Sequence, residues 1–166
     1  MAEHENSIGE TSEWYTPPEI FEALDCVFDL DPCSPGGGHC VPAKKFYTKE
    51  DDGLSKDWEG LVWMNPPFGG RNGHIPWIKK LLEHGEGIGL VRAYTSAKWF
   101  HDWIPKFSSI VFPRGKTKFI REDGTIGKNP GHGICLVGIS RNADRILEDC
   151  GLGIYINLKA NQYIFS

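Results

Sequence analysis

Short apolar runs alternate with segments of helical periodicity along most of the chain. Apolar runs of strand length occupy residues 60–64, 87–91, 108–112 and 134–139. Residues 28–31 are expected to form a short strand that Pro32 stops, and residues 154–158 and 163–165 are expected to form edge strands. Apolar side chains at helical spacing predict helices that carry Ile20, Leu24 and Val27, then Ile75 to Leu82 ending at Gly85, then Trp99, Phe100 and Trp103, and finally residues 141–150. Strands that alternate with helices predict an α/β sheet with flanking helices.

Local signals place the helix starts. In Thr16-Pro17-Pro18-Glu19, the threonine can cap a helix, Pro17 suits its first position, and Glu19 completes a capping box. Thr95 or Ser96 is expected to cap the helix that carries Trp99.

The length of the chain limits its organisation. At 166 residues we expect one domain over residues 13–166, preceded by a flexible, polar N-terminus at residues 1–12. No apolar run has the length of a membrane span, so we expect no membrane partner.

Net charge and cysteine content limit the kind of binding partner and the cellular compartment that we expect. A formal net charge of −4 argues against a general polyanion binder but leaves room for a local basic strip. Five cysteines are an odd number, and no signal peptide is evident, so we expect a reducing cytoplasm.

The segment with the most specific chemistry is Asn65-Pro66-Pro67-Phe68, directly after the apolar run at residues 60–64. An aromatic amine is a poor nucleophile, because its lone pair is delocalised into the ring. Two acceptors can bind its hydrogens: the side-chain carbonyl of asparagine, and a backbone carbonyl that prolines hold rigidly. Phe68 offers a flat face for an extruded base. The alternative is an ordinary proline-stiffened turn.

This loop resembles the Asn-Pro-Pro-aromatic motif of amino methyltransferases, and its context resembles the small phage-type DNA N6-adenine methyltransferases. The matching segments are Glu13-Trp14-Tyr15-Thr16-Pro17-Pro18, Leu30-Asp31-Pro32-Cys33-Ser34, Glu50-Asp51-Asp52-Gly53-Leu54 and the loop itself, with looser matches at residues 112–116 and 131–133. The resemblance implies a Rossmann-like S-adenosylmethionine-dependent methyltransferase that acts on adenine N6 in double-stranded DNA. It implies the cytoplasm of a bacterial host if the gene is carried by a phage.

The resemblance also implies cofactor contacts. Tyr15, Thr16 and Pro17 would cover the methionine part of the donor, and Asp31, Pro32 and Cys33 correspond to the first cofactor motif. Asp31 can hold the ammonium group, whereas Asp51 and Asp52 are candidates for the ribose hydroxyls or the adenine amino group, with a solvated acidic turn as the alternative. The short interval between Asp31 and Asn65 leaves no room for two further strand–helix units, so we expect a trimmed sheet.

A basic stretch in the second half is the candidate DNA-binding segment. It contains Arg114, Lys116, Lys118, Arg121 and Lys128, to which Arg71 beside the Asn65 loop is added. These side chains could contact phosphates, or the stretch could be a solvated hairpin.

Three alternatives stay open. Cys33, His39 and Cys40 lie close together but fit no standard zinc spacing, so we expect no metal. The same acceptor chemistry would serve cytosine N4, an RNA base or a glutamine amide. A module that binds cofactor or DNA without catalysis is the remaining reading.

Overall fold

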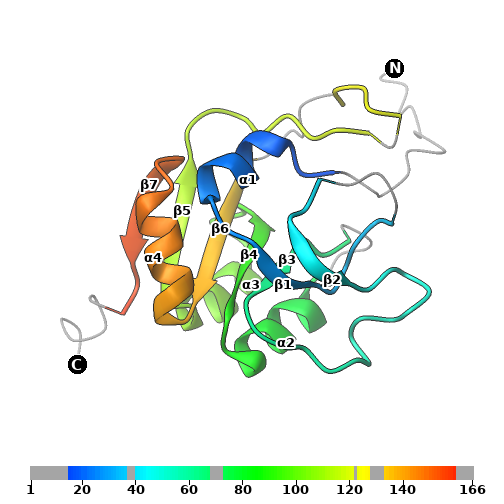
Figure 1. Cartoon of the computed structure of the whole chain (residues 1–166). Coiled ribbons are helices and arrows are strands. Elements are labelled where there is room, and N and C mark those ends of the chain that lie inside the picture. The colour runs from blue at the N-terminus through cyan, green and yellow to red at the C-terminus, as the bar shows by residue number, and fades with distance from the viewer. Residues whose placement is uncertain (1–14, 37–39, 68–72, 122, 128–132, 160–166) are drawn as a thin grey trace, which may run out of the picture.

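The computed structural model describes residues 15–36, 40–67, 73–121, 123–127 and 133–159. They form a seven-stranded sheet with helices on both faces (Figure 1), which confirms the expected α/β class. The strands are β1 (Phe28–Asp31), β2 (Ala43–Phe46), β3 (Val62–Met64), β4 (Gly87–Arg92), β5 (Ser109–Pro113), β6 (Ile134–Ile139) and β7 (Gly153–Asn157). The helices are α1 (Pro18–Leu24), α2 (Ile75–His84), α3 (Lys98–Trp103) and α4 (Arg141–Asp149), with a 3-10 turn at Ile104–Lys106.

The sheet has a parallel half and an antiparallel half. Its order is β2-β1-β3-β4-β6-β5-β7. Strands β2, β1, β3 and β4 are parallel, whereas β6, β5 and β7 pair antiparallel to their neighbours. The chain runs outward from β1 to β2 and returns past β1 to β3. The connections therefore diverge between β1 and β3, where open α/β sheets form a ligand crevice.

The expected trimming is present in the parallel half. The described residues between β1 and β2, and those between β2 and β3, contain no helix. In the described parts of these two connections, turns and irregular segments thus take the place of the helical crossovers that a parallel sheet usually requires.

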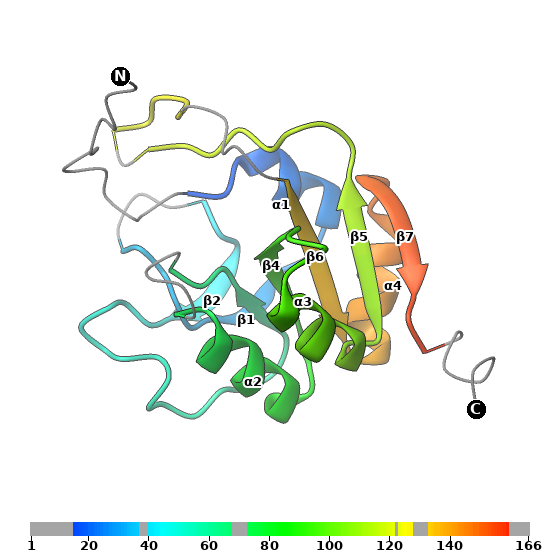
Figure 2. The same ribbon diagram turned by 180° about the vertical axis from the view of Figure 1, so that it is seen from behind.

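Two apolar cores lie on opposite faces of the sheet. Helices α1 and α4 cover one face, and α2 and α3 cover the other (Figures 1 and 2). The first core joins Phe21 of α1 and Leu147 of α4 to Trp63 of β3. The second joins Ile78 and Leu81 of α2 to the opposite side of the sheet. Both layers hold the ends of β1 and β3 in place.

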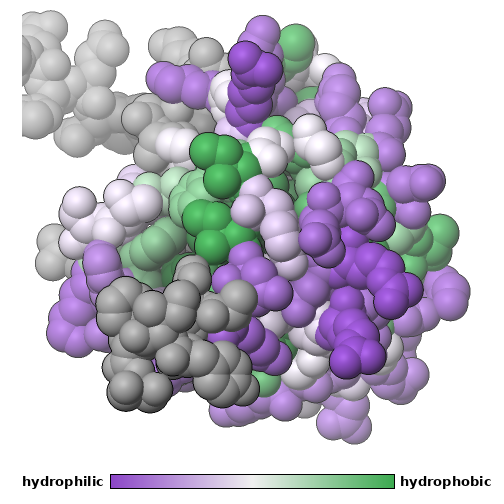
Figure 3. Space-filling model, turned by 90° about the vertical axis from the view of Figure 1, so that its left-hand side faces the viewer, coloured by the Kyte–Doolittle hydropathy of each residue, from purple (hydrophilic) through white to green (hydrophobic). Residues whose placement is uncertain are grey.

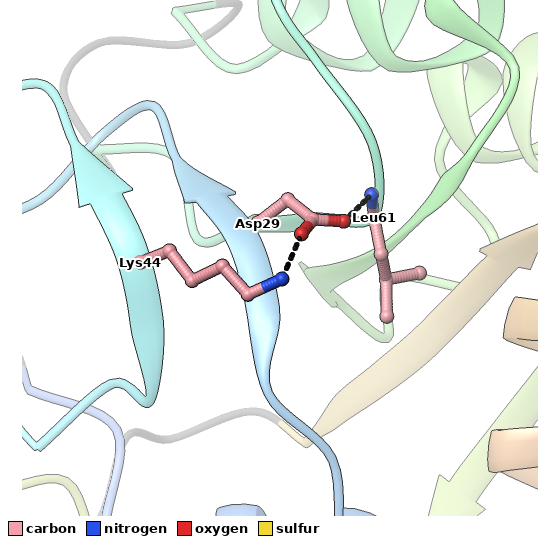
Figure 4. Close-up of polar contacts among 3 residues, drawn as sticks. All are labelled: Asp29, Lys44 and Leu61. Carbon is pink, nitrogen blue, oxygen red and sulfur yellow. Dashed lines mark hydrogen bonds and ion pairs between the residues drawn. The ribbon is translucent and has the colours of Figure 1, made fainter.

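Strand β2 was not predicted, because its sequence Ala-Lys-Lys-Phe is neither apolar nor alternating and three of its four residues are exposed. Contacts with β1 explain it (Figure 4): the Asp29 carboxylate accepts hydrogen bonds from Lys44 Nζ and from the Leu61 backbone N–H, both at 2.8 Å. The bond from Lys44, followed by the one from Leu61, lowers the pKa of Asp29. Exposed lysines also protect a sheet edge from pairing with other chains.

The close approach at Asp29 constrains the start of β3. Gly60 has φ +62°, and a Cβ placed there would lie 2.2 Å from Asp29 Oδ2. The predicted strand at residues 60–64 accordingly begins two residues later, at Val62.

Both predicted helix caps at α1 and α3 are wrong. Helix α1 begins at Pro18 after Pro17, without a side-chain cap bond, so the capping box of Thr16 and Glu19 does not form. Val27 lies beyond this helix and is 58% exposed. Helix α3 begins after Ala97 rather than after Thr95 or Ser96.

The remaining elements lie within two residues of their expected bounds. The predicted strand at residues 163–165 and the N-terminus at residues 1–12 lie outside the described residues. At the far edge of the sheet, β7 exposes 67% of Ile154, and Figure 3 shows hydrophobic side chains gathered on this side beside a hydrophilic flank. Within the described ranges, no helix is both long and apolar enough to cross a membrane.

Candidate active site

A cavity of about 250 Å³ opens at the carboxyl ends of the first three parallel strands. Asp31 closes β1, Asn65 follows β3, and Thr48 lies two residues after β2. The cavity therefore occupies the crevice where the connections diverge, and its volume approaches the range of about 300–1,000 Å³ for small-molecule sites.

Most of the residues proposed from sequence for the catalytic and cofactor roles line this cavity. They are Tyr15, Thr16, Asp31, Pro32, Cys33, Asp52, Asn65, Pro66 and Pro67. Pro17 and Asp51 are not among the lining residues, and Phe68 lies outside the described residues. Segments that are far apart in the sequence thus meet at one site.

Asn65 lines the cavity and has an unused hydrogen-bond acceptor. Its Nδ2 donates a hydrogen bond to Thr16 Oγ1 at 3.1 Å, whereas its Oδ1 is buried without a hydrogen-bond partner. The Thr16 hydroxyl, expected to cap a helix, instead holds the Asn65 amide. A buried polar atom without a partner costs about 1–3 kcal/mol, so this oxygen is suited to a donor group of a ligand.

Asp31 is a buried carboxyl group, 2% exposed. Burial raises its pKa to about 7, although the Cys33 backbone N–H, which donates to Oδ1 at 3.2 Å, acts to lower it. Burial, and then the charge of Asp31, also raises the pKa of the Cys33 thiol well above its usual value. A cation that enters the cavity beside Asp31 would favour the ionised carboxylate.

Asp51 and Asp52 are neighbours in the turn at residues 48–53, but their side chains have different surroundings. Asp51 accepts hydrogen bonds from the Thr48 backbone N–H at 2.8 Å and from its hydroxyl at 3.0 Å, which lower the pKa of Asp51. Asp51 thus forms the acidic turn that was the alternative reading. Asp52 faces the cavity, with its backbone in the left-handed region at φ 53°.

Gly53 packs this turn against the end of β1. Trp58 Nε1 donates to the Gly53 carbonyl at 2.8 Å, and a Cβ at residue 53 would lie 1.9 Å from the Pro32 carbonyl oxygen. A side chain would therefore push the turn away from Pro32.

Gly53→Ala is expected to lower the free energy of unfolding by about 1–3 kcal/mol, the usual cost of overpacking. Urea denaturation measures the change. Gly133→Ala is the matched control, because its Cβ would meet only the Ala93 Cβ, at 3.8 Å. Equal stability of the two variants would show that the turn moves without cost.

Sequence reasoning missed several residues that line the cavity: Ser34, Pro35, Cys40, Val41, Thr48, Lys49, Gly53, Trp63 and Trp77. Trp63 had a usable signal, since it precedes Asn65 by two residues and strand residues at that spacing share a face. Trp77 had none, because it belongs to the helix after the loop. Cys40, whose thiol donates to the Thr16 carbonyl at 3.2 Å, depends on a long-range contact.

The basic stretch lies partly beside this site. Residues 114–121 and 123–127 run across the top of Figure 1, above α1. Ile120 and Tyr15 exchange backbone hydrogen bonds of 2.8 and 3.0 Å, and Ile120 also bridges to Ile126. Arg114, Lys116, Lys118 and Arg121 are exposed, whereas Lys128 and Arg71 lie outside the described residues.

The cavity residues Cys33 and Cys40 do not form part of a metal site in the described structure. Among the residues it describes, no group of three or more histidine, cysteine, aspartate or glutamate side chains could hold a metal ion. His39 is not among those residues. All five cysteines are free thiols.

Comparisons with known proteins identify a family and a relative that this sequence resembles. The sequence model of the DNA N-6-adenine-methyltransferase (Dam) family matches residues 6–145. The DNA N-6-adenine-methyltransferase of Haemophilus phage HP1 (strain HP1c1) is 29% identical over 109 residues, which cover 60% of each chain. No solved structure matches the chain.

Proposed function

The chain belongs to the DNA N-6-adenine-methyltransferase (Dam) family, and from this membership we propose that it methylates the N6 amino group of adenine in double-stranded DNA with S-adenosylmethionine as the donor. The observation that carries the proposal is the buried, unpartnered Oδ1 of Asn65 at the cavity. A relative that is matched over 60% of its length supports the same activity.

The residues of the cavity fit the donor. Asp31 would hold its ammonium group, Asp52 would contact the ribose hydroxyls, and Trp63 and Trp77, which also line the cavity, would form aromatic walls. Gly53 and Pro32, which are in close contact, also line the cavity. When bound there, S-adenosylmethionine supplies an electrophilic methyl group on a sulfonium.

The chain's own residues would prepare the amino group. Asn65 Oδ1 accepts one hydrogen of the amine, and the backbone carbonyl of the Asn65-Pro66-Pro67 segment accepts the other. These bonds draw the nitrogen lone pair out of conjugation and toward the methyl group. Thr16 fixes the orientation of the Asn65 amide at 3.1 Å, and the prolines limit movement of the loop. Phe68 would stack on the extruded base.

DNA would be held in part by the basic stretch. Arg114, Lys116, Lys118 and Arg121 are exposed on a segment that pairs with Tyr15 at the cavity, and Lys128 and Arg71 are assigned to the same role. Such contacts to phosphates would position the duplex without reading its sequence. A cytoplasmic location is part of the proposal, because it would supply the DNA and keep the thiols reduced.

Affinity for S-adenosylmethionine is expected to depend on pH through Asp31. The free carboxyl has a pKa of about 7, and a bound ammonium lowers it, so binding releases a proton below that pH. The affinity should therefore fall as pH drops from about 7.5 to about 5.5, at most about tenfold per pH unit. Isothermal titration at several pH values measures it.

Asp31→Asn is the control for this pH profile, because an amide does not titrate in the range. Its affinity should be low and nearly independent of pH. A wild-type affinity that stays constant from about pH 5.5 to about pH 7.5 would remove Asp31 from the ammonium site.

The acceptor class is tested by incubating the protein with S-adenosylmethionine labelled in its methyl group. Mixed-sequence duplex DNA, RNA and protein extract are offered separately. The proposal expects label in DNA. Label in RNA or protein would assign the site to another amino group, and binding of the donor without any transfer would indicate an inactive module.

A further inference from the structure

A second, open groove lies on the other side of α2 from the cavity. Its walls are the start of α2, the end of β4 and helix α3. Trp77 of α2 lines the cavity, whereas Pro76 and Lys79 of the same helix line the groove. The two hollows therefore share one helix as a partition.

The groove opens at the same edge of the sheet as Asn65. Met64 is in register with Gly89 of the parallel strand β4, so Asn65 and Arg92 both extend toward the carboxyl ends of these strands. Residues 65–73 connect β3 to α2, and His74 at the end of this connection lines the groove. A strand of DNA whose base reaches Asn65 would pass close to this surface.

The charge of the groove is predominantly positive. Lys79, Arg92 and Lys98 line it, against one acid, Asp102. Asp102 forms an ion pair with Lys98 at 2.5 Å. Lys106 adds a cation beside the rim, 4.3 Å from the centroid of the Trp103 ring. In a chain with a net charge of −4, such a local excess of cations favours a polyanionic partner.

Aromatic rings alternate with these cations. Tyr94 is 37% exposed. The guanidinium carbon of Arg92 lies over its ring, 5.7 Å from the ring centroid. Lys79 Nζ lies 4.9 Å from the Trp103 ring centroid. Cations interleaved with aromatic faces are the combination that binds unpaired nucleotides, because phosphates contact the cations while bases stack on the rings.

The imidazole of His74 has an unsatisfied nitrogen in the groove. His74 Nε2 is buried and has no hydrogen-bond partner, and its ring packs edge-on against Trp99 with centroids 4.4 Å apart. Burial, and then the charge of Arg92, lowers the pKa of His74. A neutral imidazole nitrogen here can bond to a base edge or a sugar hydroxyl.

We propose that this groove binds the nucleotides that flank the target base on the strand being methylated. The inference rests on the proposed function. Tyr94 would stack on a flanking base, Lys79 and Lys98 would contact phosphates, and His74 would contact a base or sugar. The basic stretch at residues 114–127 would then hold the duplex from the other side of the cavity.

The test measures binding of a labelled single-stranded oligonucleotide of mixed sequence, and of the same sequence as a duplex, by fluorescence anisotropy. Tyr94→Ala should weaken binding of the single strand about five- to a hundredfold, and Tyr94→Phe should restore most of it. Lys79→Gln should reduce the slope of log affinity against log salt by about 0.7. Lys45→Gln, on the outer strand β2, is the matched charge control and should change neither value.

The outcomes separate the two proposals. If the wild-type protein methylates DNA and both Tyr94→Ala and Lys79→Gln bind DNA normally, the proposed role of the groove is wrong and the proposed function stands. A wild-type protein that neither binds nor methylates DNA would overturn both. If the wild-type protein binds poly-glutamate but not DNA, and Lys79→Gln loses this binding, the groove instead binds an acidic protein partner.

Discussion

Asn65→Ala is expected to lower the rate of methyl transfer to DNA by about a hundredfold to a thousandfold. This is the usual loss when one preorganised polar group is removed from an active site. Oδ1 of Asn65 has no hydrogen-bond partner in the protein, so its contribution is available to the amino group that reacts. Single-turnover assays with saturating donor and DNA measure the chemical step.

Binding controls separate catalysis from folding in this experiment. Affinity for S-adenosylmethionine should change little, because Asp31 and the turn at residues 48–53 form the donor side of the cavity. Asn142→Ala, at an exposed position of α4, is the matched control and should react at the wild-type rate. A fully folded Asn65→Ala variant with near wild-type activity would refute the assigned role of Asn65.

Asp31→Asn is expected to weaken binding of S-adenosylmethionine about ten- to a hundredfold at about pH 7.5. A hydrogen bond to a charged group contributes about 1.5–3 kcal/mol, and the carboxyl group is 2% exposed, so water compensates poorly for its loss. Asparagine keeps the volume of the side chain and can still accept from the Cys33 N–H. Isothermal titration measures the affinity.

Asp29→Asn is the matched control for this second variant. It lies on the same strand but binds Lys44 and the Leu61 N–H rather than the cavity. It should lower stability without changing donor affinity. An unchanged dissociation constant in Asp31→Asn would mean that the donor's ammonium group is held elsewhere.

The sequence was sufficient for the strands whose side chains face an apolar core. The run Leu61 to Met64 is buried throughout, and the loop after it could be located because prolines end a strand. The fold class follows from such segments. Strand β2 could not be predicted, because its stability comes from pairing with β1 and from the Asp29–Lys44 ion pair rather than from its own pattern.

The sequence motifs that form the site could be predicted, but the contacts that each of their residues makes could not. Sequence could not tell Asp51 from Asp52, since the difference is a turn in which Asp51 bonds to Thr48. Local rules assigned Thr16 to a helix cap, whereas the tertiary fold directs its hydroxyl to Asn65, 49 positions along the chain. The catalytic role of Asn65 and the cofactor role of Asp31 stay predictions until the variants are measured.

The most direct test of the account is to identify the methylated nucleoside. Duplex DNA from a host without adenine methylation is incubated with the protein and S-adenosylmethionine, digested to nucleosides and analysed by mass spectrometry. We predict N6-methyldeoxyadenosine with wild-type protein and little or none with Asn65→Ala over the same interval. N4-methyldeoxycytidine, or N6-methyldeoxyadenosine formed equally by both proteins, would contradict it.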